Sequence, residues 1–335
     1  MRGKTKECGM KPCRGSAVVV WLVAAGILCR VGAELSTVLI FSRCDRYEHT
    51  ASKNNFIAFV EELGDELGFD VVAGENAEEV LTDRALEEFD LTIWNNNCWL
   101  DLDTEYEEAF REYMESGGNY VGVHCACALH GLWPWYSDTL LNADFLDHAS
   151  VEEGRAYVEQ KNRDHPILEN VPDEFLISEE WYTFEPDPSD NPDNIVLVLV
   201  DEDTYQGAKM GGYHPMAWAR ELDGGGKMFF TAFGHDPALY NDPGPFRTLV
   251  RNAIRWSGEG IVRTPSVQPP RAGAVTSPMP GIGSREVYDV LGHQLGAVHQ
   301  GTVVHGRSLP AGVYILKTVD RSGHVARRAH LSTGQ

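Results

Sequence analysis

The chain has 335 residues, enough for one large domain and an appendage, because domains tend to split beyond about 250 to 300 residues. Hydrophobic residues make up 43% and aromatic residues 10% of the chain, which argues against a disordered protein. Acidic residues outnumber basic ones by 50 to 28, for a formal net charge of −22. Such a charge repels nucleic acid and anionic membranes, so we expect no nucleic-acid partner and favour a small neutral ligand.

Residues 1–33 have the pattern of a secretory signal peptide. They contain six Lys/Arg and the apolar run AVVVWLVAAGIL at 17–28. This run is too short for a membrane span, which needs about 20 residues, and small residues at 31–33 suit a signal peptidase. A lipoprotein is disfavoured because the large Leu28 precedes Cys29, and an uncleaved anchor is the other alternative. We therefore expect a protein that the secretion machinery exports to the cell surface or beyond.

The segment 34–260 begins with alternating strand and helix patterns. LSTVLIFS at 35–42 is a continuous apolar run, typical of a buried parallel strand. A helix with one apolar face follows, with Thr50 or Ser52 as its N-cap and Gly68 as its end. FDVV and LTIWNN are the next predicted strands, with the helix-like EEVLTDRALEEF between them. DTEYEEAFREYMESGG at 103–118 is the most regular helix, because its apolar residues recur at i, i+3, i+4 and i+7.

Further strands are predicted at NYVGV, IVLVLV and KMFFTAF, and a closing helix begins at Pro245. This alternation predicts an α/β fold with a doubly wound, mostly parallel sheet of the flavodoxin type. Ligands of such sheets bind outside the carboxyl ends of the strands. We therefore expect one crevice to be shared by the residues that follow the strands, namely Cys44, Asn95 to Cys98, His124 to Cys127, Gly234 and His235.

The composition changes after residue 260. Residues 261–284 are rich in proline and predict a linker. Residues 285–335 contain short strand patterns separated by glycine turns, which predict a small C-terminal β appendage.

Cys44, Cys98, Cys125 and Cys127 are the cysteines that remain after the predicted signal peptide. Export permits disulfides, and a bond within C-x-C is strained, so we expect any bond to involve Cys44 and Cys98. A nucleophile elbow of the form G-x-Nuc-x-G has His124 at its centre here. Cys125 comes one position later and faces the other side of the sheet if the strand pleat continues. A buried packing role is therefore the better interpretation of Cys125.

Two kinds of polar site are compatible with the remaining residues. The C-x-C spacing does not suit structural zinc, but a divalent metal site assembled from distant residues stays open, with His49, His124, Glu180 and His235 as ligands. Glu179 and Glu180 stand beside aromatic residues, which raise a carboxyl pKa toward values useful in proton transfer. A solvated acidic edge is the alternative for this pair. Aromatic residues in predicted loops suit sugar binding or plugs beneath the loops, and they include Trp133, Trp135, Tyr136, Trp181, Tyr182 and Trp218.

Several motifs together resemble the ThuA-like (trehalose utilisation) family, whose fold is similar to that of class I glutamine amidotransferases. In chain order these are RCDRYEH, GGNYVGVHCAC, DHPILENVPDEF, SEEWYTF, YHPMAWAREL, GGGKMFFTAFGH and NAIRW, over residues 36–257. Asn119 and the two cysteines of C-x-C depart from the glycine and small residues that are usual in the family. The resemblance implies that His124 replaces the amidotransferase nucleophile.

The same resemblance implies a carbohydrate-related function, with a divalent metal in some members. It suggests that His124, Glu180 and His235 are catalytic, and that His49, Tyr182 and His214 bind substrate. Asn95, at the end of a predicted strand, and Trp218, among the aromatic residues of predicted loops, complete the expected substrate-binding residues. The expected activity is acid–base processing of a neutral disaccharide or keto-sugar, by a hydrolase or an isomerase. The alternatives are a non-catalytic carbohydrate-binding or cell-surface protein and a Cys125-dependent amidotransferase. The tail, with LPAGVY before a basic strand, resembles in part the C-terminal sorting domains of type IX secretion.

Overall fold

The computed structural model describes residues 35–241 and 243–259 in full. Beyond these it describes the backbone of four strands, β12 (Arg285–Asp289), β13 (Gln294–Val298), β14 (Gly312–Val319) and β15 (Val325–Ser332). The predicted signal peptide at 1–33 and the predicted linker at 261–284 both lie outside the described residues. Within the described part of the chain, no helix is both long and apolar enough to cross a membrane.

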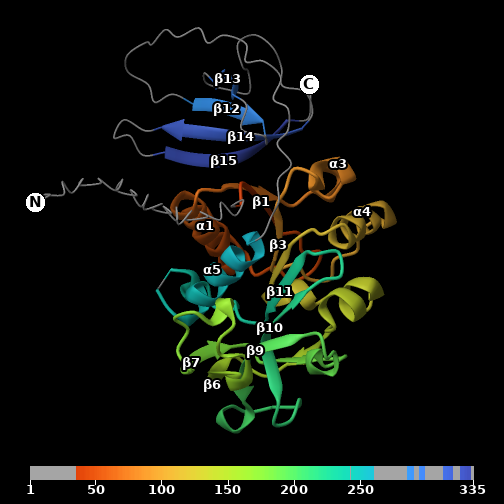
Figure 1. The fold of residues 1–335 in the computed structure, drawn as a ribbon, viewed down its shortest axis with the longest axis vertical. Helices are drawn as coiled ribbons and strands as arrows, with labels where there is room; N and C mark the ends of the chain where they lie inside the picture. Colours follow the sequence, from red (N-terminus) through yellow and green to blue (C-terminus); the bar gives the residue numbers. More distant parts are fainter. Residues whose placement is uncertain are drawn as a thin grey trace, which may run out of the picture. The chain divides into compact units, whose positions relative to one another are not determined.

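A nine-stranded sheet forms the centre of the domain, in the order β2-β1-β3-β4-β11-β10-β9-β6-β7 (Figure 1). Five neighbouring strands run parallel: β1 (Thr37–Phe41), β2 (Asp70–Gly74), β3 (Leu91–Asn95), β4 (Tyr120–Val123) and β11 (Lys227–Thr231). The other strands continue the sheet in antiparallel pairs: β10 (His214–Glu221), β9 (Ile195–Asp201), β6 (Glu152–Val158) and β7 (Glu174–Glu179). The predicted α/β class is confirmed, with a sheet that is mixed.

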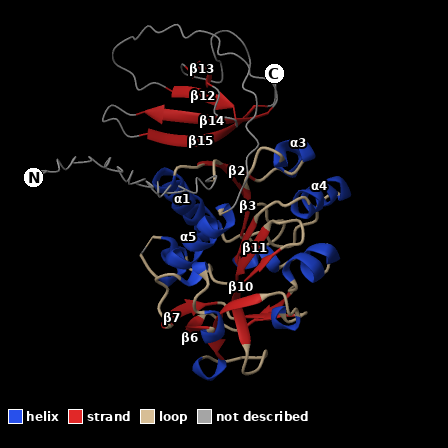
Figure 2. Ribbon diagram, viewed as in Figure 1, coloured by secondary structure: helices blue, strands red, loops and turns tan. Residues whose placement is uncertain are grey.

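Helices cover both faces of the parallel strands (Figure 2). On one side are α1 (Thr50–Leu67) and α5 (Pro245–Gly258), and on the other are α3 (Asp83–Leu86) and α4 (Thr104–Glu115). The predicted ends hold at Gly68, which caps α1 with φ 88°, and at Pro245, which begins α5. The predicted N-cap of α1 was wrong, because the helix begins at Thr50 itself and His49 occupies the cap position.

Short elements complete the domain. The segment EEVLTDRALEEF forms two helices rather than one, because Thr82 caps α3 after α2 (Ala77–Val80) has ended. Strands β5 (Phe145–His148) and β8 (Tyr182–Phe184) pair as a separate antiparallel ribbon. The short 3₁₀ and π turns are η1 (His124–Cys127), η2 (Trp135–Leu141), η3 (Gln160–Asn162), η4 (Pro166–Leu168), η5 (Pro188–Asp190), η6 (Glu202–Thr204) and η7 (Pro237–Tyr240).

The core explains the continuous apolar runs of the sequence. Every residue of β1, β3 and β4 is buried, as expected for parallel strands that helices cover on both faces. Aromatic rings fill the space between β3 and α4, where Trp94 lies 4.7 Å from Phe110 and 5.0 Å from Tyr136 between ring centroids. Trp133 packs against the same cluster, so the interpretation of this loop aromatic as a hydrophobic plug is the correct one.

The four C-terminal strands form a sheet of their own, in the order β13-β12-β14-β15 with antiparallel pairing throughout. This is the small β appendage that the strand patterns of residues 285–335 predict.

Candidate metal centre

Four polar residues from distant segments meet at the edge of the sheet where the parallel strands end. His49 lies in the segment between β1 and α1, His124 directly follows β4, His235 follows β11 and Glu180 follows β7. One ligand atom from each residue lies within 4.8 Å of one from every other. The set that the sequence suggested as a metal site is therefore assembled in space, as expected for a parallel sheet whose loops share one edge.

His124 occupies the sharp turn at the end of β4. Its backbone has a φ of 55°, the left-handed conformation of an elbow residue, and the chain then turns into η1. Its Nδ1–H donates to the carbonyl of Ala232 at 2.9 Å, so the second proton of the ring, when present, is on Nε2. Burial opposes this proton, but Cys125 and the carboxylates of Glu180 and Glu179 outweigh burial and raise the pKa of His124 well above its ordinary value. Nε2 lies 3.5 Å from Oε2 of Glu180 and 3.0 Å from the hydroxyl of Tyr182. The backbone carbonyl thus orients the ring so that Nε2 faces the cluster.

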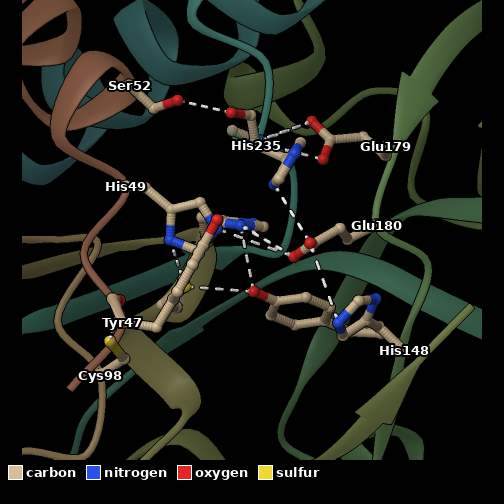
Figure 3. A network of polar contacts seen from close by, with 12 residues as sticks. Tyr47, His49, Ser52, Cys98, His148, Glu179, Glu180 and His235 are labelled. Atoms are coloured by element: carbon tan, nitrogen blue, oxygen red, sulfur yellow. Dashed lines mark hydrogen bonds and ion pairs between the residues drawn. The ribbon is translucent and has the colours of Figure 1, made fainter. Parts of the chain in front are cut away.

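His235 is held through its backbone on two sides (Figure 3). The carboxylate of Glu179 accepts hydrogen bonds from the backbone N–H groups of Gly234 at 2.6 Å and His235 at 3.2 Å. Ser52, in the first turn of α1, donates its hydroxyl to the carbonyl of His235 at 2.5 Å. Glu179 is fully buried, and this burial raises its pKa to about 7 despite the opposing charge of His124 and the two N–H donors.

The remaining contacts converge on the carboxylate of Glu180. Its Oε1 lies 3.3 Å from Nδ1 of His235, and its Oε2 lies 3.9 Å from Nε2 of His49. Burial alone raises the pKa of Glu180, but hydrogen bonds and charge from His124 and His235 outweigh it and hold the pKa below its ordinary value. The carboxylate is therefore anionic within a group of three imidazoles.

These residues fit a divalent metal ion. Three imidazoles and one carboxylate are ligand types that zinc and similar ions accept. Within the described structure, Nε2 of His49 and Nδ1 of His235 are buried, and each has only the Glu180 carboxylate nearby, at 3.9 Å and 3.3 Å, without a well-aligned hydrogen bond. Buried nitrogen atoms without a partner are costly, and an ion among the four donor atoms would satisfy them. His49 and His124 also pack edge to face with ring centroids 4.8 Å apart, which limits their rotation.

A disulfide bond lies beside the segment that carries His49. Cys44 and Cys98 are bonded, with Cα atoms 4.8 Å apart, which confirms the expected pairing. The bond joins the segment after β1 to the segment after β3, across 54 positions of sequence. His49 therefore lies in a segment tied at one end by a covalent bond and at the other by α1.

A cavity of about 290 Å³ adjoins the cluster, and Glu180, His49 and Tyr182 form part of its wall. The sequence did not identify three of its lining residues, Trp99, Phe145 and His148, and it suggested His130 only as a weak candidate in a local cluster with Cys125 and Cys127. Trp99 and His130 stack with ring centroids 3.4 Å apart. A larger cavity, of about 690 Å³, is lined by residues that precede β3 and β4, and none of its lining residues is a histidine or cysteine. Of these two cavities, the smaller one is therefore the one lined by histidine and cysteine residues.

The position of Cys125 differs from the expectation. The strand pleat ends at Val123 and η1 begins, so the thiol does not face the other side of the sheet. Its Sγ lies 3.3 Å from Nδ1 of His49 and 3.2 Å from the hydroxyl of Tyr182. Burial opposes ionisation of this thiol, but the charge and hydrogen bonds of His124 and His49 prevail and lower its pKa to about 6.

Three residues predicted to bind substrate do not reach the cavity. Asn95 is fully buried and donates its amide to the hydroxyl of Ser42 and the carbonyl of Lys53. His214 is also fully buried, and its Nε2–H donates to the carbonyl of Tyr182 at 2.7 Å. Trp218 is fully buried, and its indole N–H donates to Leu141 at 3.0 Å. These side chains support the fold around the site and are not available to a ligand.

Replacing Trp218 with phenylalanine tests this reassignment. We expect the free energy of unfolding to fall by about 1–3 kcal/mol, because the carbonyl of Leu141 loses its donor and a small void remains. Chemical denaturation measures this loss, and ligand titration of the folded protein should give an unchanged dissociation constant. Weaker binding without lower stability would restore Trp218 as a ligand-binding residue.

The domain is similar to known proteins of one family. Residues 37–257 match the family described as ThuA, trehalose utilisation. A ThuA-like protein from Bacteroides uniformis has 25% sequence identity and a TM-score of 0.57, over 66% of this chain and 91% of its own. A ThuA-like protein from Parabacteroides merdae has 17% identity and a TM-score of 0.52, over 70% and 94% of the two chains. A glutamine amidotransferase from Thermotoga maritima has 11% identity and a TM-score of 0.42, over 67% and 98%.

No curated protein matches the chain. The family match nevertheless spans the whole fully described domain, from β1 to α5. The chain therefore belongs to the ThuA (trehalose utilisation) family.

Proposed function

We propose that the domain binds a divalent metal ion through His49, His124, Glu180 and His235 and processes a neutral carbohydrate, a disaccharide or keto-sugar, in the adjoining cavity. The observation that carries the proposal is the meeting of these four ligand atoms within 4.8 Å at the wall of an aromatic cavity. A bound ion supplies a Lewis acid that polarises a sugar oxygen. The family description, trehalose utilisation, supports a carbohydrate as the substrate class.

The side chains of the cavity account for binding and proton transfer in this proposal. Phe145 and Tyr182, with ring centroids 4.5 Å apart, offer apolar surface to the C–H face of a sugar ring. At the wall, the anionic carboxylate of Glu180 can accept a proton or hydrogen bond, and the hydroxyl of Tyr182, whose pKa burial raises well above its ordinary value, can donate a hydrogen bond.

Turnover of trehalose, other disaccharides and their 3-keto derivatives by the metal-loaded protein tests the proposal. His124→Ala and Glu180→Ala should each abolish product formation, because each removes a metal ligand, and Glu180→Ala also removes a carboxylate from the cavity wall. Circular dichroism should show that both variants remain folded. Undiminished turnover in both would refute the proposal, and tight sugar binding without any product would instead support a non-catalytic carbohydrate-binding protein.

Cys125→Ser distinguishes this proposal from a cysteine-dependent amidotransferase. The thiol contacts His49 without belonging to the four ligands, so we expect the variant to keep most of its sugar turnover at saturating metal. Metal affinity itself should fall by about 10- to 100-fold, since Cys125 orients a ligand. Glutamine hydrolysis by the unaltered protein, lost in Cys125→Ser, would favour the amidotransferase.

We also propose that the protein acts outside the cytoplasm. The Cys44–Cys98 bond supports this location, because disulfides persist in oxidising compartments. Mass spectrometry of the protein recovered from the cell surface or medium should show an N-terminus near residue 34. Deletion of residues 285–335 should block release if the tail acts as a type IX sorting domain, whereas unchanged release would show that the tail has another function.

A further inference from the structure

Given the proposed sugar-processing function, we infer that the cavity recognises two neighbouring hydroxyls of the sugar, a vicinal diol, through His148 and Glu180. His148 ends β5 and faces the cavity from the ribbon formed by β5 and β8. It is not one of the four grouped ligands. Figure 3 shows its ring on the opposite side of Glu180 from His235.

The hydrogen bond at Nδ1 of His148 determines whether Nε2 of the neutral ring is a donor or an acceptor. Nδ1–H donates to the backbone carbonyl of Ala149 at 2.7 Å, so in the neutral ring Nε2 carries a lone pair. The side chain is 40% exposed, whereas that of Glu180 is 11% exposed. His148 thus presents a hydrogen-bond acceptor in a fixed orientation at the accessible part of the site.

The distance to Glu180 leaves room for a ligand. Nε2 of His148 lies 3.8 Å from Oε1 of Glu180, beyond the 2.7–3.2 Å or so of an N–H···O hydrogen bond. Oε1 of Glu180 also faces Nδ1 of His235 at 3.3 Å, but on the side of His148 the two facing atoms are both acceptors in the neutral ring, so a donor between them must come from a ligand. Hydroxyls on adjacent carbons of a sugar ring lie close enough together for one to donate to Nε2 and the other to Oε1.

The surroundings of His148 favour a sugar over a small polar ion. Phe145 lies 5.9 Å from His148 and 4.5 Å from Tyr182 between ring centroids, so an apolar surface adjoins the two acceptors. A ligand with two adjacent hydroxyls and a C–H face matches both features. A simple anion would meet acceptors and an anionic carboxylate, which repel it.

Calorimetric titration of the zinc-loaded protein at about pH 8, where ordinary imidazoles are neutral, tests the inference. The probes are methyl α-D-glucopyranoside and its 2-deoxy, 3-deoxy and 4-deoxy derivatives. In the unaltered protein, two derivatives that lack neighbouring hydroxyls should each bind about 3- to 10-fold more weakly than the parent. In His148→Phe, one of these two should bind as well as the parent does, because its missing hydroxyl no longer has an acceptor.

His148→Gln serves as the matched control, since its amide oxygen restores an acceptor and should recover part of the discrimination. Metal content of all variants should stay unchanged, because His148 is not among the four ligands. If every deoxy derivative loses the same affinity relative to the parent sugar, both in the unaltered protein and in His148→Phe, the diol inference is wrong. That result would leave the proposed carbohydrate function standing. Failure of the parent sugar to bind the metal-loaded protein would overturn the diol inference and the proposed carbohydrate function together. Failure of zinc to bind would refute the metal centre instead, and sugar titration of the metal-free protein would then decide the diol inference by the same comparison.

Discussion

Replacing His124 with asparagine lowers the affinity of the protein for zinc or another divalent ion by more than about 100-fold. This expectation exceeds the 10- to 100-fold effect of residues that only orient ligands, because His124 supplies a ligand atom itself. Asparagine tolerates the left-handed backbone of the elbow, whose φ is 55°, so the substitution should leave the fold intact. Competition with a coloured chelator measures the affinity, and elemental analysis of the purified protein measures the metal content.

His130→Gln is the matched control for this experiment. It removes an imidazole from the wall of the same cavity, yet His130 is not among the four ligands. Its metal affinity should match that of the unaltered protein. Equal affinities for the His124 variant and the unaltered protein would mean that the three histidines and Glu180 do not form a metal centre.

Removing the disulfide by Cys44→Ser together with Cys98→Ser lowers the free energy of unfolding by about 4 kcal/mol. The magnitude follows from the closed loop, whose ends are 54 positions apart, since a cross-link of that span restricts the unfolded chain strongly. Metal affinity should fall as well, because the segment that carries His49 loses its covalent attachment beside the cluster. Denaturant titration gives the first quantity and chelator competition the second.

A reducing agent provides the control for the disulfide. It should weaken metal binding by the unaltered protein and leave the serine double variant as it was. A variant as stable as the unaltered protein would show that the native contacts already restrict this segment. Weaker stability with unchanged metal affinity would show that α1 alone positions His49.

Much of the fold follows from strong local patterns. The parallel strands read as continuous apolar runs because helices cover both of their faces. The helix at Thr104–Glu115 follows from its periodicity, and Pro245 and Gly68 mark helix ends for steric reasons. Strands β6 and β7 escaped notice because exposed polar residues interrupt their apolar pattern; β7 is the edge strand and β6 is its neighbour.

Only part of the site could be predicted from the sequence. Residues that follow strand ends meet in space, which is how His124 and His235 were placed in one crevice, whereas His49 and Glu180 joined them as candidate ligands because imidazole and carboxylate suit a divalent metal. The same rule also selected Asn95, whose buried amide binds the protein itself. His148 was missed because its strand, β5, pairs only with β8, and no local pattern reveals that pairing.

The ligand supplied by Glu180 has a consequence for the dynamics of the sheet. Glu180 directly follows β7, the last strand at the antiparallel edge, whereas His124 and His235 follow strands in the parallel half. An ion held by all four side chains would cross-link the two halves, so its binding should slow amide hydrogen exchange in β6 and β7, far along the sheet from β4. Local unfolding of β6 and β7 would in turn open the metal centre and release the ion. The rate of metal loss would therefore measure how often this edge of the sheet unfolds.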